Sequence, residues 1–249
     1  MLGTARQDLP VEGAVNSKSH KPELRCGRVV EYYEQLAGSY DRDRFGSSYG
    51  AYIHAQERRI LRQWLLPHSR GQILDLACGT GRLLDLATHG LDASEAMVRI
   101  ARTRHPGKPI HCGPATEMAR VGVRFDTIFC LHLFMHLSQP EIESLTKAVR
   151  NHLRTGGFFI FDAPTAFRRK LTGFQPDGWH AGTALSPVEV CALAGLGWRL
   201  RRTRGVLFFP IHRLPSWSRP ALRPLDDLIG ITPLKALSSY TLYSLERTA

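Results

Sequence analysis

The chain alternates between short apolar runs and longer stretches in which apolar residues recur every three or four positions. Short runs are typical of buried strands, and the longer spacing is typical of helices with one buried face. Strands are expected at residues 72–77, around 91, at 109–112, 125–131 and 158–161. Helices are expected at 82–87, at 94–104 with Ser94 as its cap, and from a capping box at Ser138 to Gly156 and Gly157. This alternation predicts a parallel α/β sheet.

The flanking segments have weaker patterns. Residues 1–28 predict a mobile tail, followed by a helix from Val29 that ends near Gly38. Residues 51–66 form a clear amphipathic helix. After Asp162 we expect a loop at 163–183, a helix at 187–194, and strands at 198–209 and 239–246 around a proline-rich segment.

Composition places the chain among ordinary globular proteins, with 249 residues, 43% hydrophobic and 22% charged. Its formal net charge of +11 favours an acidic partner, which would be nucleic acid, an anionic membrane or an anionic small molecule. A solvated basic surface is the plain alternative. The five cysteines are scattered and predict neither disulfides nor a metal site. Without an apolar leader or an 18-residue apolar span, we expect a cytoplasmic protein.

A glycine-rich turn carries the chemistry. Gly79 and Gly81 lie between a predicted strand that contains Asp75 and a predicted helix, a place where backbone N–H groups can face a ligand. Asp92 follows the second strand, where a carboxylate can accept two ribose hydroxyls. Asp126 begins the fourth strand. Together these residues predict a nucleoside-containing ligand, and a structural tight turn is the alternative.

Four motifs resemble those of class I S-adenosylmethionine-dependent methyltransferases, and most resemble the UbiE/COQ5-like (type 11) group. They are ILDLACGTGRLL at 73–84, GLDASEAM at 90–97, FDTIFCLHLFMHL at 125–137 and LRTGGFFIFDAP at 153–164. YEQLAGSYD at 33–41 is similar to that group's lid helix. The resemblance implies a Rossmann-like, doubly wound sheet of about seven strands, with a reversed last strand and helices on both faces. It divides the chain into lid helices at 29–70 and a methyltransferase domain at 71–249, with a cap or substrate segment around 163–235.

The resemblance also implies S-adenosyl-L-methionine as cofactor and a set of residues around it. Gly79 and Gly81 would pass beneath the methionine part, Asp75 would orient the turn, and Asp92 would bind the ribose. The other implied contacts are Tyr33 and Tyr40 from the lid, Ala77 in the turn, Ala93 and Met97 near the adenine, the Ala115 N–H, and the backbone of Leu131.

Two departures from the family pattern bear on cofactor affinity. Asp92 follows Gly81 about six positions sooner than usual, which would displace it. Pro114 stands where the family has an aspartate, so the contact to the adenine amine is absent. Either change would weaken cofactor binding without removing the turn.

His132 and His136 follow the fourth strand and are the candidate catalytic residues. The cofactor's methyl group is already activated, so alignment with a nucleophile is the main requirement. A hydroxyl nucleophile also benefits from a general base, and a neutral imidazole at His132 could supply it. For His136 the interpretation as a packing residue is favoured.

The expected activity is methyl transfer to a small molecule, at a hydroxyl oxygen of a quinone, sugar, lipid or secondary metabolite. The basic runs at 168–170 and 199–204 could guide an anionic substrate, or they are solvated faces. Nucleic-acid methylation and a catalytically weak scaffold of the same fold are the alternatives.

Overall fold

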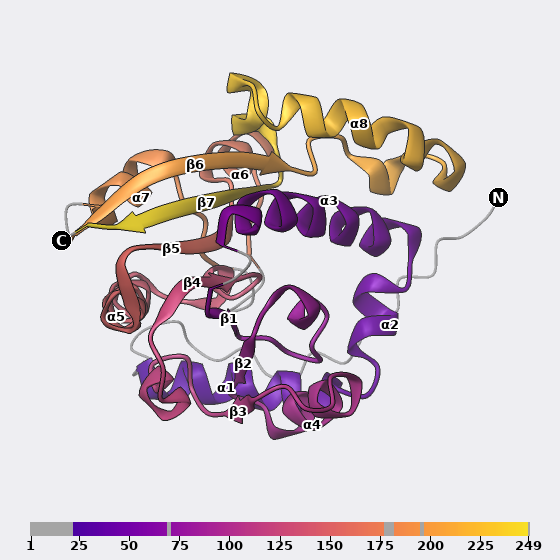
Figure 1. The fold of residues 1–249 in the computed structure, drawn as a ribbon. Coiled ribbons are helices and arrows are strands. Elements are labelled where there is room, and N and C mark those ends of the chain that lie inside the picture. Colours follow the sequence, from indigo (N-terminus) through magenta and orange to yellow (C-terminus); the bar gives the residue numbers. More distant parts are fainter. Residues whose placement is uncertain (1–21, 69–70, 177–181, 195–196, 249) are drawn as a thin grey trace.

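The computed structural model describes residues 22–68, 71–176, 182–194 and 197–248. A seven-stranded sheet with the order β3-β2-β1-β4-β5-β7-β6 runs through the molecule, and helices lie on both sides of it (Figure 1). The strands are β1 Ile73–Leu76, β2 His89–Asp92, β3 Ile110–Cys112, β4 Phe125–Cys130, β5 Leu153–Pro164, β6 Trp198–Val206 and β7 Tyr240–Arg247. The helices are α1 Pro22–Leu36, α2 Tyr40–Phe45, α3 Ser48–Leu65, α4 Glu95–Arg104, α5 Gln139–His152, α6 Ala166–Thr172, α7 Pro187–Ala194 and α8 Arg219–Ile229.

Strand pairing confirms the predicted topology. β1 pairs in parallel with β2 and β4, and β4 pairs in parallel with β5. β7 is antiparallel to both β5 and β6, so it is the reversed strand. The carboxyl ends of β1, β2 and β4 therefore meet at one edge, which is where parallel sheets bind ligands.

Side-chain alternation along the strands builds two cores. Leu74, Ile128 and Phe159 face one side, where α5 and α7 cover them. Their sequence neighbours Ile73 and Phe129 face the other side, where α3 and α4 cover them. Since α3 belongs to this second core, only α1 and α2 of the predicted lid helices border the ligand edge.

Four expectations about the helices and strands were wrong. The helix expected at 82–87 is only a 3₁₀ turn at Leu84–Leu86, because β2 begins at His89 and leaves no room for more. The segments read as loop and proline-rich linker contain α6 and α8. In α8, Pro220 lies in the first turn, where a proline loses no intrahelical hydrogen bond, and Pro224 lies inside the helix at the cost of one such bond. Gly156 and Gly157 lie inside β5. α1 begins at Pro22, within the predicted tail, whereas residues 1–21 lie outside the described residues.

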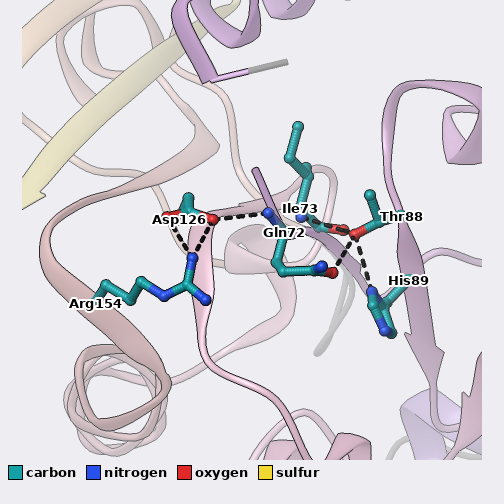
Figure 2. A network of polar contacts seen from close by, with 6 residues as sticks. All are labelled: Gln72, Ile73, Thr88, His89, Asp126 and Arg154. Atoms are coloured by element: carbon teal, nitrogen blue, oxygen red, sulfur yellow. Dashed lines mark hydrogen bonds and ion pairs between the residues drawn. The ribbon is translucent and has the colours of Figure 1, made fainter. Parts of the chain in front are cut away.

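Asp126 has a structural role, which corrects its assignment to the ligand site. It lies at the amino end of β4, at the sheet edge opposite the glycine-rich turn. Its carboxylate accepts the Gln72 N–H at 2.7 Å and pairs with Arg154 at 2.6 Å (Figure 2). Beside it, the Thr88 hydroxyl donates to the Ile73 carbonyl and accepts the Ile73 N–H, each at 2.8 Å (Figure 2). These bonds fix the start of β1 between its neighbours.

Among the described helices, none has the length and apolar character needed to cross a membrane. Cys78, Cys112, Cys130 and Cys191 are free thiols, as the sequence predicted.

Candidate cofactor and acceptor site

A cavity of about 230 Å³ lies at the carboxyl ends of β1, β2 and β4 and beneath α1. Eleven of the thirteen predicted site residues line it. They lie either at the carboxyl end of a strand or within six residues after it, or on the lid. They are Tyr33, Tyr40, Ala77, Gly79, Asp92, Ala93, Met97, Ala115, Leu131, His132 and His136. Asp75 and Gly81 do not line the cavity.

Asp92 is held at the glycine-rich turn despite the short connection before it. Its Oδ2 accepts the Gly79 N–H at 2.7 Å, and its Oδ1 accepts the Ser94 N–H at 2.9 Å. Burial raises the pKa of Asp92, and these two N–H donors counteract that rise. Each carboxylate oxygen keeps acceptor capacity beyond its one backbone donor. The 3₁₀ turn at Leu84–Leu86 absorbs the missing residues, so the short connection still brings Asp92 to the glycine-rich turn.

The glycines of the turn have different roles. Gly79 has φ +53°, and a Cβ there would meet no atom within 4 Å, so its surface is open to a ligand. Gly81 has φ +85°, and a Cβ there would come within 3.0 Å of the His105 ring. Gly81 is thus required for packing beneath the turn. Asp75 lies buried in β1, where burial raises the pKa of its carboxyl.

Apolar groups surround the cavity end predicted for adenine. Ala93 and Met97 line it from the start of α4, and Pro114 and Ala115 line it from the loop after β3. The Gly113 N–H donates to the Asp92 carbonyl at 2.9 Å, which holds that loop beside β2. Pro114 thus supplies an apolar wall where the family pattern has a carboxylate.

The lid contacts the turn through residues that the sequence did not single out. Glu34 of α1 accepts the Ala96 N–H at 3.0 Å and also the Ser94 hydroxyl, at the beginning of α4. Asp41 of α2 accepts the Thr80 hydroxyl at 2.8 Å and pairs with Arg104. A carboxylate at Glu34 near the first turn of another helix is favourable. α1 and α2 are therefore fixed to the cofactor edge by side-chain bonds.

An aromatic group lies between the lid and the turn after β4. It consists of Tyr33 and Tyr40 from the lid and His136. The Tyr33 and Tyr40 ring centroids are 5.7 Å apart, and the Tyr33 hydroxyl lies 3.0 Å from His136 Nε2. Burial raises the pKa of Tyr40 to about 12 and raises that of Tyr33 further, so both phenols stay neutral. His136 is buried with Tyr33 as partner, which agrees with its interpretation as a packing residue.

An ionic cluster lies beside the cavity at the ends of β4 and β5. His132 Nε2 is 2.7 Å from Glu57 Oε1, and its Nδ1 is 3.6 Å from Asp162 Oδ2. The His132 N–H also donates to Asp162 Oδ1 at 2.6 Å. Arg82 lies 2.9 Å from Glu57 and stacks on the Phe45 ring, 4.1 Å from its centroid. Both imidazole nitrogens of His132 thus face carboxylates.

The pKa values follow from these neighbours. Burial opposes charge on Glu57, but His132 and Arg82 outweigh it and lower the pKa of Glu57 to about 2. Burial likewise opposes a charged His132, but Glu57 and Asp162 outweigh it and raise the pKa of His132. Burial raises the pKa of Asp162, against the effect of His132. The cluster therefore favours an imidazolium at His132.

Glu57, His132 and Asp162 also have metal-ligating atoms within 4.8 Å of one another. Arg82 occupies one side of Glu57, so two cations already balance the two carboxylates when His132 is protonated. We therefore interpret the group as an internally neutralised ionic cluster. Sequence reasoning missed Glu57 because it belongs to no motif. It gave no role to Asp162, which lies in the motif at 153–164 but is 105 positions from Glu57 along the chain.

Comparison with known proteins identifies the class. Residues 73–157 match the family model of a methyltransferase domain. The structure of a magnesium protoporphyrin IX methyltransferase of Synechocystis, solved with bound SAH, superposes with a TM-score of 0.63 at 15% identity, covering 90% of this chain and 100% of that one. The chain therefore contains a methyltransferase domain at residues 73–157, in a fold that it shares with an enzyme solved with bound SAH.

Two curated relatives are sugar methyltransferases. A dTDP-4-amino-2,3,4,6-tetradeoxy-D-glucose N,N-dimethyltransferase of Saccharopolyspora spinosa is 35% identical over 106 residues, which are 39% of this chain and 41% of the relative. A dTDP-3-amino-3,6-dideoxy-alpha-D-glucopyranose N,N-dimethyltransferase of Streptomyces fradiae is 28% identical over 186 residues, which are 70% and 72% of the two chains. The match to an uncharacterised Methanocaldococcus jannaschii protein spans 50% of it, so the chain spans half or less of the first relatives matched.

Proposed function

We propose that this chain transfers a methyl group from S-adenosylmethionine to the amino nitrogen of a small molecule. The observation that carries the cofactor half of the proposal is Asp92, whose two carboxylate oxygens are oriented by backbone N–H groups beside an open Gly79 surface. A carboxylate fixed in this way is suited to the two hydroxyls of a ribose.

The acceptor half rests on the ionic cluster. A hydroxyl acceptor needs a base, and the sequence predicted a neutral His132 for that role. His132 faces two carboxylates that raise its pKa, and a protonated imidazole has no lone pair to accept a proton. A neutral amine carries its own lone pair and needs no base to attack. The two sugar N,N-dimethyltransferases among the relatives act on amino groups, which supports the same choice.

In this proposal the chain binds and orients the cofactor and the acceptor and shields them from water. S-adenosylmethionine supplies an electrophilic methyl group. Asp92 and the glycine-rich turn hold the cofactor edge of the cavity. Leu131 and His132, at the end of β4, lie between that edge and the ionic cluster. Tyr33 and Tyr40 cover the cavity and exclude water, which favours transfer through proximity.

The test separates cofactor binding from acceptor choice. Calorimetry should show S-adenosylmethionine binding that weakens about tenfold or more in Asp92→Ala, since hydrogen bonds to a charged group contribute ~1.5–3 kcal/mol. A scaffold without activity would bind cofactor but form no S-adenosylhomocysteine with any acceptor.

Acceptor choice is tested with matched pairs of amino and hydroxy sugars, phenols and quinones, together with an RNA sample. We expect S-adenosylhomocysteine formation with amines, and a His132→Gln variant that retains at least a tenth of the rate. Activity on hydroxyls alone, with a loss of about 10²-fold or more in His132→Gln, would restore the general-base role of His132.

A further inference from the structure

Helix α8 is oriented opposite to an ordinary surface helix. Its acidic residues Asp226 and Asp227 are 0% and 3% exposed, whereas Leu225 and Leu228 are 47% and 58% exposed. Asp226 accepts the Tyr52 hydroxyl and the Phe208 N–H, each at 3.0 Å, so the acidic side faces α3 and the loop after β6. α8 lies along the outer edge of the molecule (Figure 1). Leu225 and Leu228 are therefore on the side of α8 that faces solvent.

Exposed apolar side chains gather around this helix. Eleven large hydrophobic residues of the described chain are exposed, and eight of them lie on α6 or just after it, on α8, or in the turns beside α8. These eight are Phe167, Leu171, Phe174, Trp217, Leu225, Leu228, Ile231 and Leu234. The 3₁₀ turn Pro233–Leu237 contacts both α6 and α8, so these elements are neighbours. We call this surface the α6–α8 face. Contiguous exposed apolar surface of this kind marks an interaction site.

The charge on the same face has one sign. Residues 163–176 and 206–239 contain seven lysines and arginines, and their only acidic residues are Asp226 and Asp227. Both of those carboxylates are buried. Arg213 and Arg223 are exposed beside Trp217 and Leu225. The face therefore presents cations and apolar groups together, which also gives a location to part of the +11 net charge.

We propose that the α6–α8 face binds the surface of an anionic lipid bilayer. Apolar side chains with a tryptophan enter the boundary between headgroups and acyl chains, while arginines and lysines contact anionic headgroups. A second copy of this chain fits less well, because two such faces would bring like charges together at a surface without exposed carboxylates.

The α6–α8 face is connected to the ionic cluster beside the cavity. Arg168 of α6 donates to the Phe208 carbonyl at 2.9 Å, and Arg169 donates to the Thr183 carbonyl at 3.1 Å. α6 begins right after Thr165, whose hydroxyl lies 3.0 Å from that of Thr241 in β7. Next to Thr241, the Tyr240 ring centroid is 6.1 Å from that of His132. These contacts link α6, through β7, to His132, which lines the cavity.

Vesicle co-sedimentation tests the proposal. The full chain is mixed with phosphatidylcholine vesicles, or with vesicles in which a third of the lipid is phosphatidylglycerol. We expect binding to the anionic vesicles at least tenfold stronger. Arg213→Gln/Arg223→Gln should weaken that binding about 25-fold, since each cation near such a surface contributes about fivefold. Leu225→Ser/Leu228→Ser should also lose about tenfold or more.

The matched control is Val188→Ser, which removes an apolar residue that is 78% exposed on α7 and does not belong to the α6–α8 face. Val188→Ser should bind as the wild type does. Tryptophan emission should shift to the blue on binding, and the shift should vanish in Trp217→Phe. Equal binding to both vesicle types, no binding, or no effect of the leucine pair would overturn the proposal. A dimer in sedimentation velocity that Leu225→Ser/Leu228→Ser dissociates would instead assign the face to a second copy.

Discussion

Two residues that line the site have left-handed backbone conformations, which residues other than glycine rarely adopt. Ala77 has φ +59° and directly follows β1. His132 has φ +62° and lies two residues after β4. A left-handed conformation costs a non-glycine residue ~1–3 kcal/mol unless the surroundings compensate. At His132 the compensation is visible, because its N–H donates to Asp162 and its ring pairs with Glu57. The ionic cluster thus holds the backbone where β4 meets the cavity.

Replacing Glu57 by Gln should change how stability depends on pH. The lowered pKa of Glu57 contributes stability above pH ~4.3, its value in unfolded chains, and this contribution is lost as the pH falls towards 2. The raised pKa of His132 contributes stability below pH ~6.5, which is lost as the pH rises through the folded-state value. Glu57→Gln removes the first contribution and reduces the second.

Urea unfolding at several pH values measures the effect. At neutral pH we expect Glu57→Gln to lose about 3 kcal/mol or more, because it leaves buried cations without their carboxylate. Glu143→Gln, on the exposed side of α5, is the matched control and should unfold like the wild type. Parallel pH profiles for Glu57→Gln and wild type would show that Glu57 does not bind its neighbours as described.

The cofactor side of the site could be predicted from the sequence, and the acceptor side could not. Gly79 and Asp92 follow consecutive strands, and parallel strands bring their carboxyl ends together whatever the rest of the chain does. Glu57 comes from a helix that was recognised only by its apolar residues. Its position next to His132 depends on how α3 crosses the sheet, which no local pattern specifies.

At the scale of elements, the lid is joined to the glycine-rich turn by Asp41. Asp41→Ala removes the bonds to Thr80 and Arg104. Because Asp41 and Arg104 are partly exposed, we expect cofactor affinity to fall about threefold to tenfold. Hydrogen exchange over residues 33–50 should slow when cofactor is added to the wild type, and should slow less in the variant.

The neighbouring Asp43 provides the control, because it lies on the same helix and its ion pair is with the adjacent Arg42. Asp43→Ala should leave both the cofactor affinity and the hydrogen exchange over residues 33–50 as in the wild type. If exchange over residues 33–50 is the same with and without cofactor in the wild type, α1 and α2 are static walls and the lid prediction fails.

Prediction of the elements succeeded where one face of a helix or strand is apolar. It failed where tertiary contacts or chain length determine the local structure. α3, α4 and α5 carry regular apolar stripes and were found. α8 was missed because its pattern is inverted, with leucines outside and aspartates inside. The helix expected after the turn does not form because Gly81 and β2 are too close in sequence.

At the scale of the whole molecule, Asp226 joins segments from the two halves of the chain. It accepts the hydroxyl of Tyr52, 174 positions earlier, and the Phe208 N–H. Asp226→Ala should lower the free energy of unfolding by about 2–4 kcal/mol, because buried donors lose a charged acceptor. Tyr52→Phe removes one bond and should cost about 1 kcal/mol. Equal losses in chemical denaturation for the two variants would mean that the Phe208 bond contributes nothing.

The position of β7 has a consequence for biosynthesis. β7 leaves the ribosome after β1–β6, yet it lies between β5 and β6 and is antiparallel to both. β3, β2, β1, β4 and β5 can pair while translation continues, but β6 has no partner and β5 keeps an open edge until β7 arrives. Unpaired edges of this kind favour aggregation of nascent chains. A premature stop before Tyr240 would therefore leave β6 without a partner and β5 with an open edge, and would make the new protein dependent on chaperones.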